Sequence, residues 1–196
     1  FVDRATHALE HARRRETPVG VIFLDLDRFK LVNDSLGHAA GDELLGVLAR
    51  RLKDAVRPMD TVARLGGDEF VILCDEVDDV DAAVEVAERI AQAIARPLVI
   101  DRREIFVTAS LGVVVSRGPD GSADELLRDA DAAMYRAKEQ GRARIEVFDE
   151  SSHRQAVTSL EIDADLHRAV ERDEFELHYQ PIVDLTTGTV SGLEAL

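Results

Sequence analysis

Two short groups of acidic residues have the types and spacing to do chemistry. In the first, Asp68 and Glu69 directly follow two glycines in the string Leu-Gly-Gly-Asp-Glu-Phe. Paired glycines can supply the positive φ angles of a two-residue hairpin turn, and they leave room for a phosphate chain near the backbone. Carboxylates at such a turn bind divalent metal ions or act as general bases. The alternative is an acidic turn that is simply solvated.

The second group is Asp25 and Asp27, at the end of a continuous apolar run over residues 19–27. Residues two apart in a strand share one face. A calcium loop is excluded, because Lys30 stands where such a loop requires glycine. Carboxylates on neighbouring strands can hold Mg²⁺ between substrate oxygens, as in two-metal phosphoryl transfer. The alternative is ordinary solvation of a strand end.

The elements that must position these carboxylates follow from hydrophobic spacing. Helix spacing predicts helices over residues 1–16, 29–36, 41–57, 80–95 and 124–140. Apolar and β-favouring runs predict strands over residues 19–27, 61–65, 68–74, 105–116 and 144–148. A hairpin inside an alternating pattern favours an α+β fold with a mixed central β-sheet flanked by helices.

A second unit follows this domain. We predict a helix over residues 160–170, a strand over 174–183, a turn at 184–188 and a returning strand over 189–196. One helix and two strands cannot bury a core of their own. The predicted organisation is therefore a domain over 1–149, a linker over 150–159 and a truncated domain start over 160–196, in a fragment of a longer protein.

Composition narrows the partners and the compartment. The 196 residues include 39 acidic and 24 basic ones, a formal charge of −15, which disfavours nucleic acid and anionic membrane surfaces. A single cysteine rules out an internal disulfide and a cysteine zinc cage, and it fits a reducing, cytoplasmic compartment. His7 and His11 share a helix face, but a zinc site there lacks a third ligand.

The stretch over residues 21–148 resembles the GGDEF family of diguanylate cyclases. The motifs that carry the resemblance follow the family in order and spacing, at residues 23–45, 63–73, 107–113 and 130–142. Membership implies a central sheet like the palm of nucleotidyl cyclases and polymerases. It also implies condensation of two GTP into cyclic di-GMP with release of two pyrophosphates.

The resemblance assigns the metal and catalytic residues. Mg²⁺, or Mn²⁺, would be held by Asp25, the main-chain carbonyl of Leu26 and Asp68, with Glu69 as a further acidic contributor. Asp68 would also accept the proton of the 3′-hydroxyl, and Lys30 would stabilise the transferring phosphoryl group. Asp27 matches the family pattern but receives no firm role.

The resemblance also assigns residues that bind GTP. Asn33 and Asp42 would read the guanine edge, whose N1–H and N2–H₂ donors adenine lacks. Lys138 and Arg142 would hold the terminal phosphates. Each pair has a structural alternative: Asn33 and Asp42 could cap helices, and the two cations could interact with a helix C-terminus.

Arg57 and Asp60 form an Arg-x-x-Asp string shortly before the glycines. In the resembled family, this position is an inhibitory site that binds the product, and Arg89 would be a secondary contact. An arginine suits bidentate contact with phosphate or guanine. The alternative is a helix-end arginine followed by a turn aspartate.

Residues 176–196 resemble the opening of an EAL domain, the cyclic di-GMP phosphodiesterase family. Only the first strands of its (β/α)₈ barrel would be present, so this chain could not hydrolyse cyclic di-GMP; Glu194 would be a metal ligand in the whole domain. The family implies a bacterial source and a catalytic homodimer. The alternatives are a non-catalytic GTP or cyclic di-GMP module that controls the EAL domain, and a protein-interaction adaptor without nucleotide.

Overall fold

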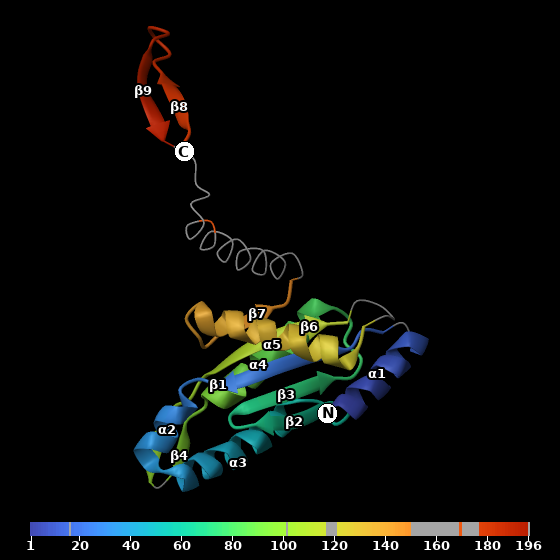
Figure 1. Cartoon of the computed structure of the whole chain (residues 1–196). Helices are drawn as coiled ribbons and strands as arrows, with labels where there is room; N and C mark the ends of the chain where they lie inside the picture. Colours follow the sequence, from blue (N-terminus) through green and yellow to red (C-terminus); the bar gives the residue numbers. More distant parts are fainter. Residues whose placement is uncertain (16, 101, 117–120, 150–168, 170–176, 196) are drawn as a thin grey trace. The chain divides into compact units, whose positions relative to one another are not determined.

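The computed structural model describes residues 1–196 except 16, 101, 117–120, 150–168, 170–176 and 196 (Figure 1). The chain divides into two compact units, Phe1–Asp149 and Glu150–Leu196. The helices of the first unit are α1 (Val2–Arg15), α2 (Phe29–Leu36), α3 (His38–Ala55), α4 (Val80–Ala95) and α5 (Ala123–Glu139). Its strands are β1 (Gly20–Leu26), β2 (Thr61–Gly66), β3 (Glu69–Cys74), β4 (Leu98–Ile100), β5 (Arg103–Ile105), β6 (Ala109–Val115) and β7 (Ile145–Val147).

A mixed sheet in the order β2-β3-β1-β6-β7 forms the centre of the first unit (Figure 1). β1 pairs antiparallel with both β3 and β6, and β7 joins β6 in parallel. The predicted mixed central sheet with flanking helices is therefore confirmed. β1 is buried along its whole length, as its continuous apolar run indicated.

The two faces of the sheet are covered by different helices. On one face, Ile22 and Ile72 pack in a cluster with apolar residues of α3 and α4. On the other face, Phe23 and Val71 pack with α1 and α5. Burial of each large apolar side chain contributes about 1.5–3 kcal/mol. None of the helices in the described part of the chain combines the length and the apolar character that crossing a membrane requires.

α5 packs unusually close to β6 at Gly112. A Cβ atom there would lie 2.0 Å from the carbonyl oxygen of Ala130 and 2.2 Å from the amide nitrogen of Met134. The helix can approach the strand this closely only because Gly112 has no side chain. This contact fixes the distance of α5 from the strands that carry the acidic residues.

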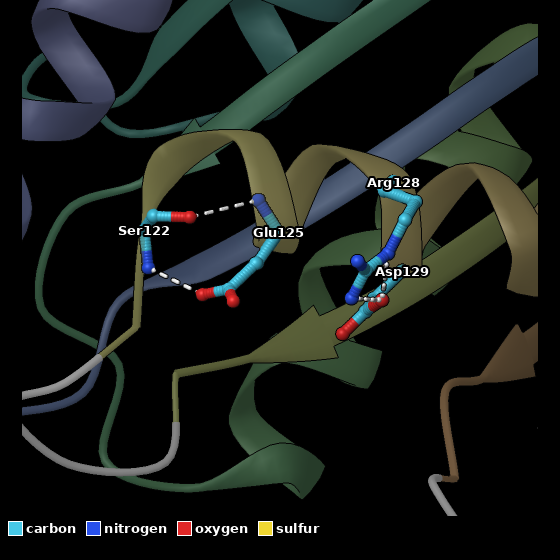
Figure 2. Close-up of polar contacts among 4 residues, drawn as sticks. All are labelled: Ser122, Glu125, Arg128 and Asp129. Atoms are coloured by element: carbon cyan, nitrogen blue, oxygen red, sulfur yellow. Dashed lines mark hydrogen bonds and ion pairs between the residues drawn. The ribbon is translucent and has the colours of Figure 1, made fainter.

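The start of α5 is fixed by a capping box (Figure 2). The Ser122 hydroxyl accepts a hydrogen bond from the Glu125 amide at 3.1 Å, and the Glu125 carboxylate accepts one from the Ser122 amide at 3.0 Å. The hydrogen bond from the Ser122 amide, together with the Ser122 side chain, holds the pKa of Glu125 below its usual range. One turn later, Arg128 pairs with Asp129 at 2.9 Å. The cap sets where α5 begins.

Three predicted boundaries were wrong. The strand predicted over 105–116 begins only at Ala109, because residue 105 belongs to the separate β4–β5 hairpin, which was not predicted. The hairpin turn lies at positions 67 and 68 rather than at the two glycines; of these glycines only Gly67 has a positive φ, of 49°. A bulge between Arg64 and Gly66 causes this one-residue offset. α3 begins at His38, earlier than predicted.

In the second unit, β8 (Tyr179–Val183) pairs antiparallel with β9 (Val190–Ala195). Asp184 closes the turn between them, because its carboxylate accepts hydrogen bonds from the amides of Thr186 and Thr187 at 2.7 and 3.1 Å. The predicted turn and returning strand are confirmed. The linker at 150–159 and most of the helix predicted over 160–170 lie outside the described residues, and the start of a barrel stays a prediction.

Candidate active site

The two acidic groups meet at one end of the central sheet. In the strand register, Glu69 on β3 and Ser110 on β6 both lie opposite Asp25 on β1. Residues directly opposite one another project from the same face of a sheet. The amide of Leu26 donates to the carbonyl oxygen of Asp68 at 3.4 Å, which ties the hairpin turn to the end of β1. Carboxylates therefore lie on the neighbouring strands β1 and β3, as the sequence predicted.

Lys138, on the last turn of α5, reaches into this acidic group. Its Nζ lies 2.7 Å from Asp25 Oδ2, and the two side chains are 28% and 11% exposed. The lysine therefore does more than interact with a helix C-terminus, the alternative that the sequence left open. The structure brings a cation predicted to bind phosphate into contact with a carboxylate predicted to bind metal.

The carboxylates of the site repel one another. Burial raises the pKa of Asp25, and the nearby Asp68 raises it further, while the hydrogen bond from Lys138 opposes both effects. Partial burial and then Asp25, Asp131 and Asp68 raise the pKa of Glu69. A divalent cation between these groups would relieve this repulsion.

Sequence reasoning did not identify Asp131 as part of this site. It lies on α5 two turns before Lys138, and it contributes to the raised pKa of Glu69. Burial also raises the pKa of Asp131 itself, and the positive charge of Lys138 opposes this effect. The seven-residue spacing of Asp131 and Lys138, which places both on one helix face, could have indicated it.

The acidic group fits a metal that the substrate helps to bind. In the described part of the chain, no three His, Cys, Asp or Glu side chains are arranged to hold a metal ion by themselves. Mg²⁺ commonly takes one or two protein carboxylates and completes its shell with substrate phosphates and water. Asp25 and Asp68, with the main-chain carbonyl of Leu26 beside them, have the oxygen chemistry for such a shared site.

Asn33 and Asp42 are brought close by the packing of α2 on α3. A Cβ atom at Gly41 would lie only 1.9 Å from Asn33 Oδ1, so the amide of Asn33 lies against the backbone immediately before Asp42. The capping alternative for Asp42 is wrong, because α3 begins at His38 and Asp42 lies inside it. α2 ends with a main-chain bond from Gly37 to the Asn33 carbonyl at 2.9 Å, and the Asn33 side chain does not form this cap.

A groove of about 530 Å³ runs between α3 and β2 next to this pair. Asp42 lines it together with apolar side chains that include Leu45 and Phe70. A mostly apolar groove with a few polar groups suits a flat aromatic ligand such as a nucleobase.

Two predicted cations are not joined to the acidic group by a contact. Lys30 is exposed on the first turn of α2 and forms no hydrogen bond or ion pair with any described residue. Arg142 is exposed in the turn after α5, with a positive φ of 65°. The structure therefore brings together Asp25, Asp68, Glu69 and Lys138. Lys30 lies at the start of α2, and Arg142 follows the end of α5.

The Arg-x-x-Asp segment forms a closed turn after α3. Asp60 accepts hydrogen bonds from the amide of Arg57 at 2.8 Å and from the amide of Asp75 at 3.3 Å. Arg89 donates to the Ala55 carbonyl at 2.7 Å. Asp60 thus has a structural role in the turn, whereas the Arg57 side chain is exposed.

Comparison with known proteins decides the family. Residues 1–144 match the family model described as diguanylate cyclase, GGDEF domain. The chain belongs to the GGDEF family. Over 194 residues it is 43% identical to the bifunctional diguanylate cyclase/cyclic di-GMP phosphodiesterase MucR of Pseudomonas aeruginosa, which covers 99% of this chain. Over 194 residues it is 36% identical to the cyclic di-GMP phosphodiesterase PdeR of Escherichia coli. The chain spans 28% of the length of MucR and 29% of that of PdeR.

Solved GGDEF domains share the fold. The chain superposes with a TM-score of 0.75 and 35% identity on the GGDEF domain of YfiN (TpbB) from Pseudomonas aeruginosa, over 80% of this chain and 91% of that one. The GGDEF domain of DgcB from Caulobacter crescentus, solved in complex with c-di-GMP, gives a TM-score of 0.68 at 29% identity over 74% of this chain and 86% of that one.

Proposed function

We propose that this GGDEF domain is an active diguanylate cyclase that condenses two GTP into cyclic di-GMP and two pyrophosphates, with Mg²⁺ or Mn²⁺. The observation that carries the proposal is the Asp25–Lys138 ion pair beside Asp68 and Glu69. The pair combines carboxylates that suit a metal with a cation that suits phosphate. A domain that only bound other proteins would have no need to bury these charges together.

Each residue of the site then has a defined task. Asp68 accepts the proton of the attacking 3′-hydroxyl, and Lys30 stabilises the charge on the transferring phosphoryl group. Lys138 and Arg142 bind the terminal phosphates, which leave as pyrophosphate. Asp25, the main-chain carbonyl of Leu26, Asp68 and Glu69 would hold the metal, which would supply charge stabilisation on the phosphate oxygens.

Asn33 and Asp42 select the base. The Asp42 carboxylate accepts from the N1–H and N2–H₂ donors of guanine, and the Asn33 amide completes the hydrogen bonding to the guanine edge. The closeness of Asn33 to the backbone at Gly41 and the groove beside Asp42 support this assignment. Adenine would leave the Asp42 carboxylate without a donor, a loss that costs about 1–3 kcal/mol.

Synthesis requires two copies of the chain. The proposed site binds one GTP, and the product contains two nucleotides, so two protomers must face each other across the reacting groups.

We also propose that cyclic di-GMP inhibits its own synthesis by binding Arg57 and Asp60, with Arg89 as a secondary contact. The exposed Arg57 guanidinium supports this second proposal.

The test is chromatography of the products after incubation of the protein with GTP and Mg²⁺. Cyclic di-GMP is expected from the wild type, and Asp68→Asn should abolish it while GTP binding persists. Binding of GTP without any product would instead support a non-catalytic module. An adaptor without nucleotide would show no thermal stabilisation by GTP and Mg²⁺.

For the second unit, we propose that residues 160–196 begin an EAL domain. The alignment with MucR, whose name includes a cyclic di-GMP phosphodiesterase, covers 99% of this chain and so includes the β8–β9 hairpin. Glu194, opposite Gln180 in that hairpin, would be a metal ligand in the complete domain. Glu194→Gln in the full-length protein should abolish hydrolysis of cyclic di-GMP, and unchanged hydrolysis would contradict the assignment.

A further inference from the structure

Asp27, which sequence reasoning left without a role, is the most extensively hydrogen-bonded carboxylate among the described residues of the site. It is 7% exposed. Its Oδ1 accepts from the Ser110 hydroxyl at 2.7 Å, and its Oδ2 accepts from the Thr108 hydroxyl at 2.7 Å and from the Ala143 amide at 3.0 Å. The carboxylate therefore joins the end of β1 both to β6 and to the turn that follows α5.

The turn after α5 needs such support. Its residues Gly141, Arg142 and Ala143 have consecutive positive φ angles of 117°, 65° and 50°. For residues with a Cβ atom, this region of backbone conformation is unfavourable and persists only where the surroundings stabilise it. The bond from the Ala143 amide to Asp27 is a contact of this kind, and it lies directly after Arg142.

The Asp25–Lys138 ion pair cannot support this turn throughout a reaction cycle. If Asp25 binds the metal and Lys138 binds phosphate, the two side chains must exchange their mutual contact for contacts with substrate. The bonds of Asp27, by contrast, go to hydroxyls and to a backbone amide, which none of the proposed steps uses. Asp27 can therefore hold the end of α5 in place while Asp25 and Lys138 change partners.

We propose that Asp27 is a positioning residue that fixes the turn after α5, so that Lys138 and Arg142 stay aligned for the terminal phosphates of the nucleotide. The inference rests on the proposed function, because it takes these two cations as phosphate ligands. The two aspartates at the end of β1 then have different roles: Asp25 binds the metal, and Asp27 holds the phosphate-binding turn in place.

The test compares the affinities for GTP and GMP, measured with Mg²⁺ by thermal shift or calorimetry. Asp27→Ala removes all three side-chain bonds. Asp27→Asn is the conservative variant: its carbonyl can still accept from Ala143 and Thr108, while its NH₂ donates to the Ser110 hydroxyl. The double variant Thr108→Val/Ser110→Ala removes the two bonds from hydroxyl groups, one on β6 and one just before it, but leaves the bond to Ala143, and it serves as a control for general loss of stability.

For Asp27→Ala we expect GTP to bind about tenfold more weakly, with GMP affinity changed by less than about twofold, since only the terminal phosphates lose aligned partners. The Asn variant and the double variant should keep the wild-type ratio of GTP to GMP affinity. Equal losses for GTP and GMP in Asp27→Ala, or a loss of the ratio in the Asn or double variant, would overturn the inference. Wild-type protein that does not prefer GTP to GMP would instead contradict the proposed function itself.

Discussion

Lys138 Nζ lies 2.7 Å from Asp25 Oδ2, so the last turn of α5 is tied by an ion pair to the strand that carries the proposed metal ligand. Asp25 and Lys138 come from distant parts of the sequence and meet because α5 packs against β6 at Gly112. Binding of Mg²⁺ and GTP must break this ion pair, because the Asp25 carboxylate then binds the metal and Lys138 binds phosphate.

Removal of the lysine should destabilise the fold through Asp25. Lys138→Met leaves a buried carboxylate without its partner, and we expect the free energy of unfolding to fall by about 1–3 kcal/mol. The double variant Asp25→Asn/Lys138→Met should recover most of this loss, because the unpaired charge is then gone. Denaturant unfolding measures both. Equal losses in the single and double variants would contradict an energetic role for the pair.

Gly41 controls the position of Asn33. In Gly41→Ala the new methyl group would overlap Asn33 Oδ1, so the amide must move away from the guanine site. We expect KM for GTP to rise about tenfold, as for the loss of one good hydrogen bond. The control is the same substitution in an Asn33→Ala background, where Gly41→Ala should raise KM little further because the side chain that it displaces is already absent. An equal rise in KM in both backgrounds would contradict the placement of Asn33.

The charge of Glu69 should lower stability at neutral pH. Its pKa is raised in the fold, so the protonated form is favoured by folding; this contribution is present below the usual value of 4.5 and is lost as the pH rises through the raised pKa. Glu69→Gln should therefore raise Tm at pH 8 and have little effect at pH 4. Thermal unfolding across this range checks the sign. A gain that does not depend on pH would show that neither burial of the Glu69 charge nor its repulsion by the neighbouring carboxylates is the cause.

Product inhibition should depend on the Arg57 side chain. Arg57→Ala keeps the backbone amide that donates to Asp60, so the turn stays closed. We expect the inhibition constant of cyclic di-GMP to rise at least about tenfold, with turnover unchanged. Arg50→Ala, an exposed arginine on α3, is the control. Unchanged inhibition in Arg57→Ala would contradict this site.

The sequence predicted the elements that have strong local patterns and missed those that lack them. β1 and α4 were predicted to within a residue, because an apolar run or a helical stripe extends over their whole length. The β4–β5 hairpin was missed, since strands of three residues are too short to show an alternating pattern. The shift of the turn to Gly67 and Asp68 depends on a bulge in β2, which the two adjacent glycines do not reveal.

Residue types in the site were easier to predict than their partners. Asp25 and Asp27 look equivalent in sequence, yet one contacts Lys138 and the other contacts Thr108, Ser110 and Ala143. These partners come from β6 and the residue before it, and from the end of α5 and the turn after it, so only the packing of distant segments brings them to β1. Asp131 was missed for the same reason.

The most direct test of cyclase activity is the initial rate of cyclic di-GMP formation from GTP and Mg²⁺, measured over a range of protein concentrations. We expect the rate per protein molecule to rise with concentration, because two loaded protomers must meet. Fusion of a coiled coil at the N-terminus should remove that dependence and raise the rate. Tight binding of GTP with no product, even in the fused dimer, would contradict the assignment as a cyclase.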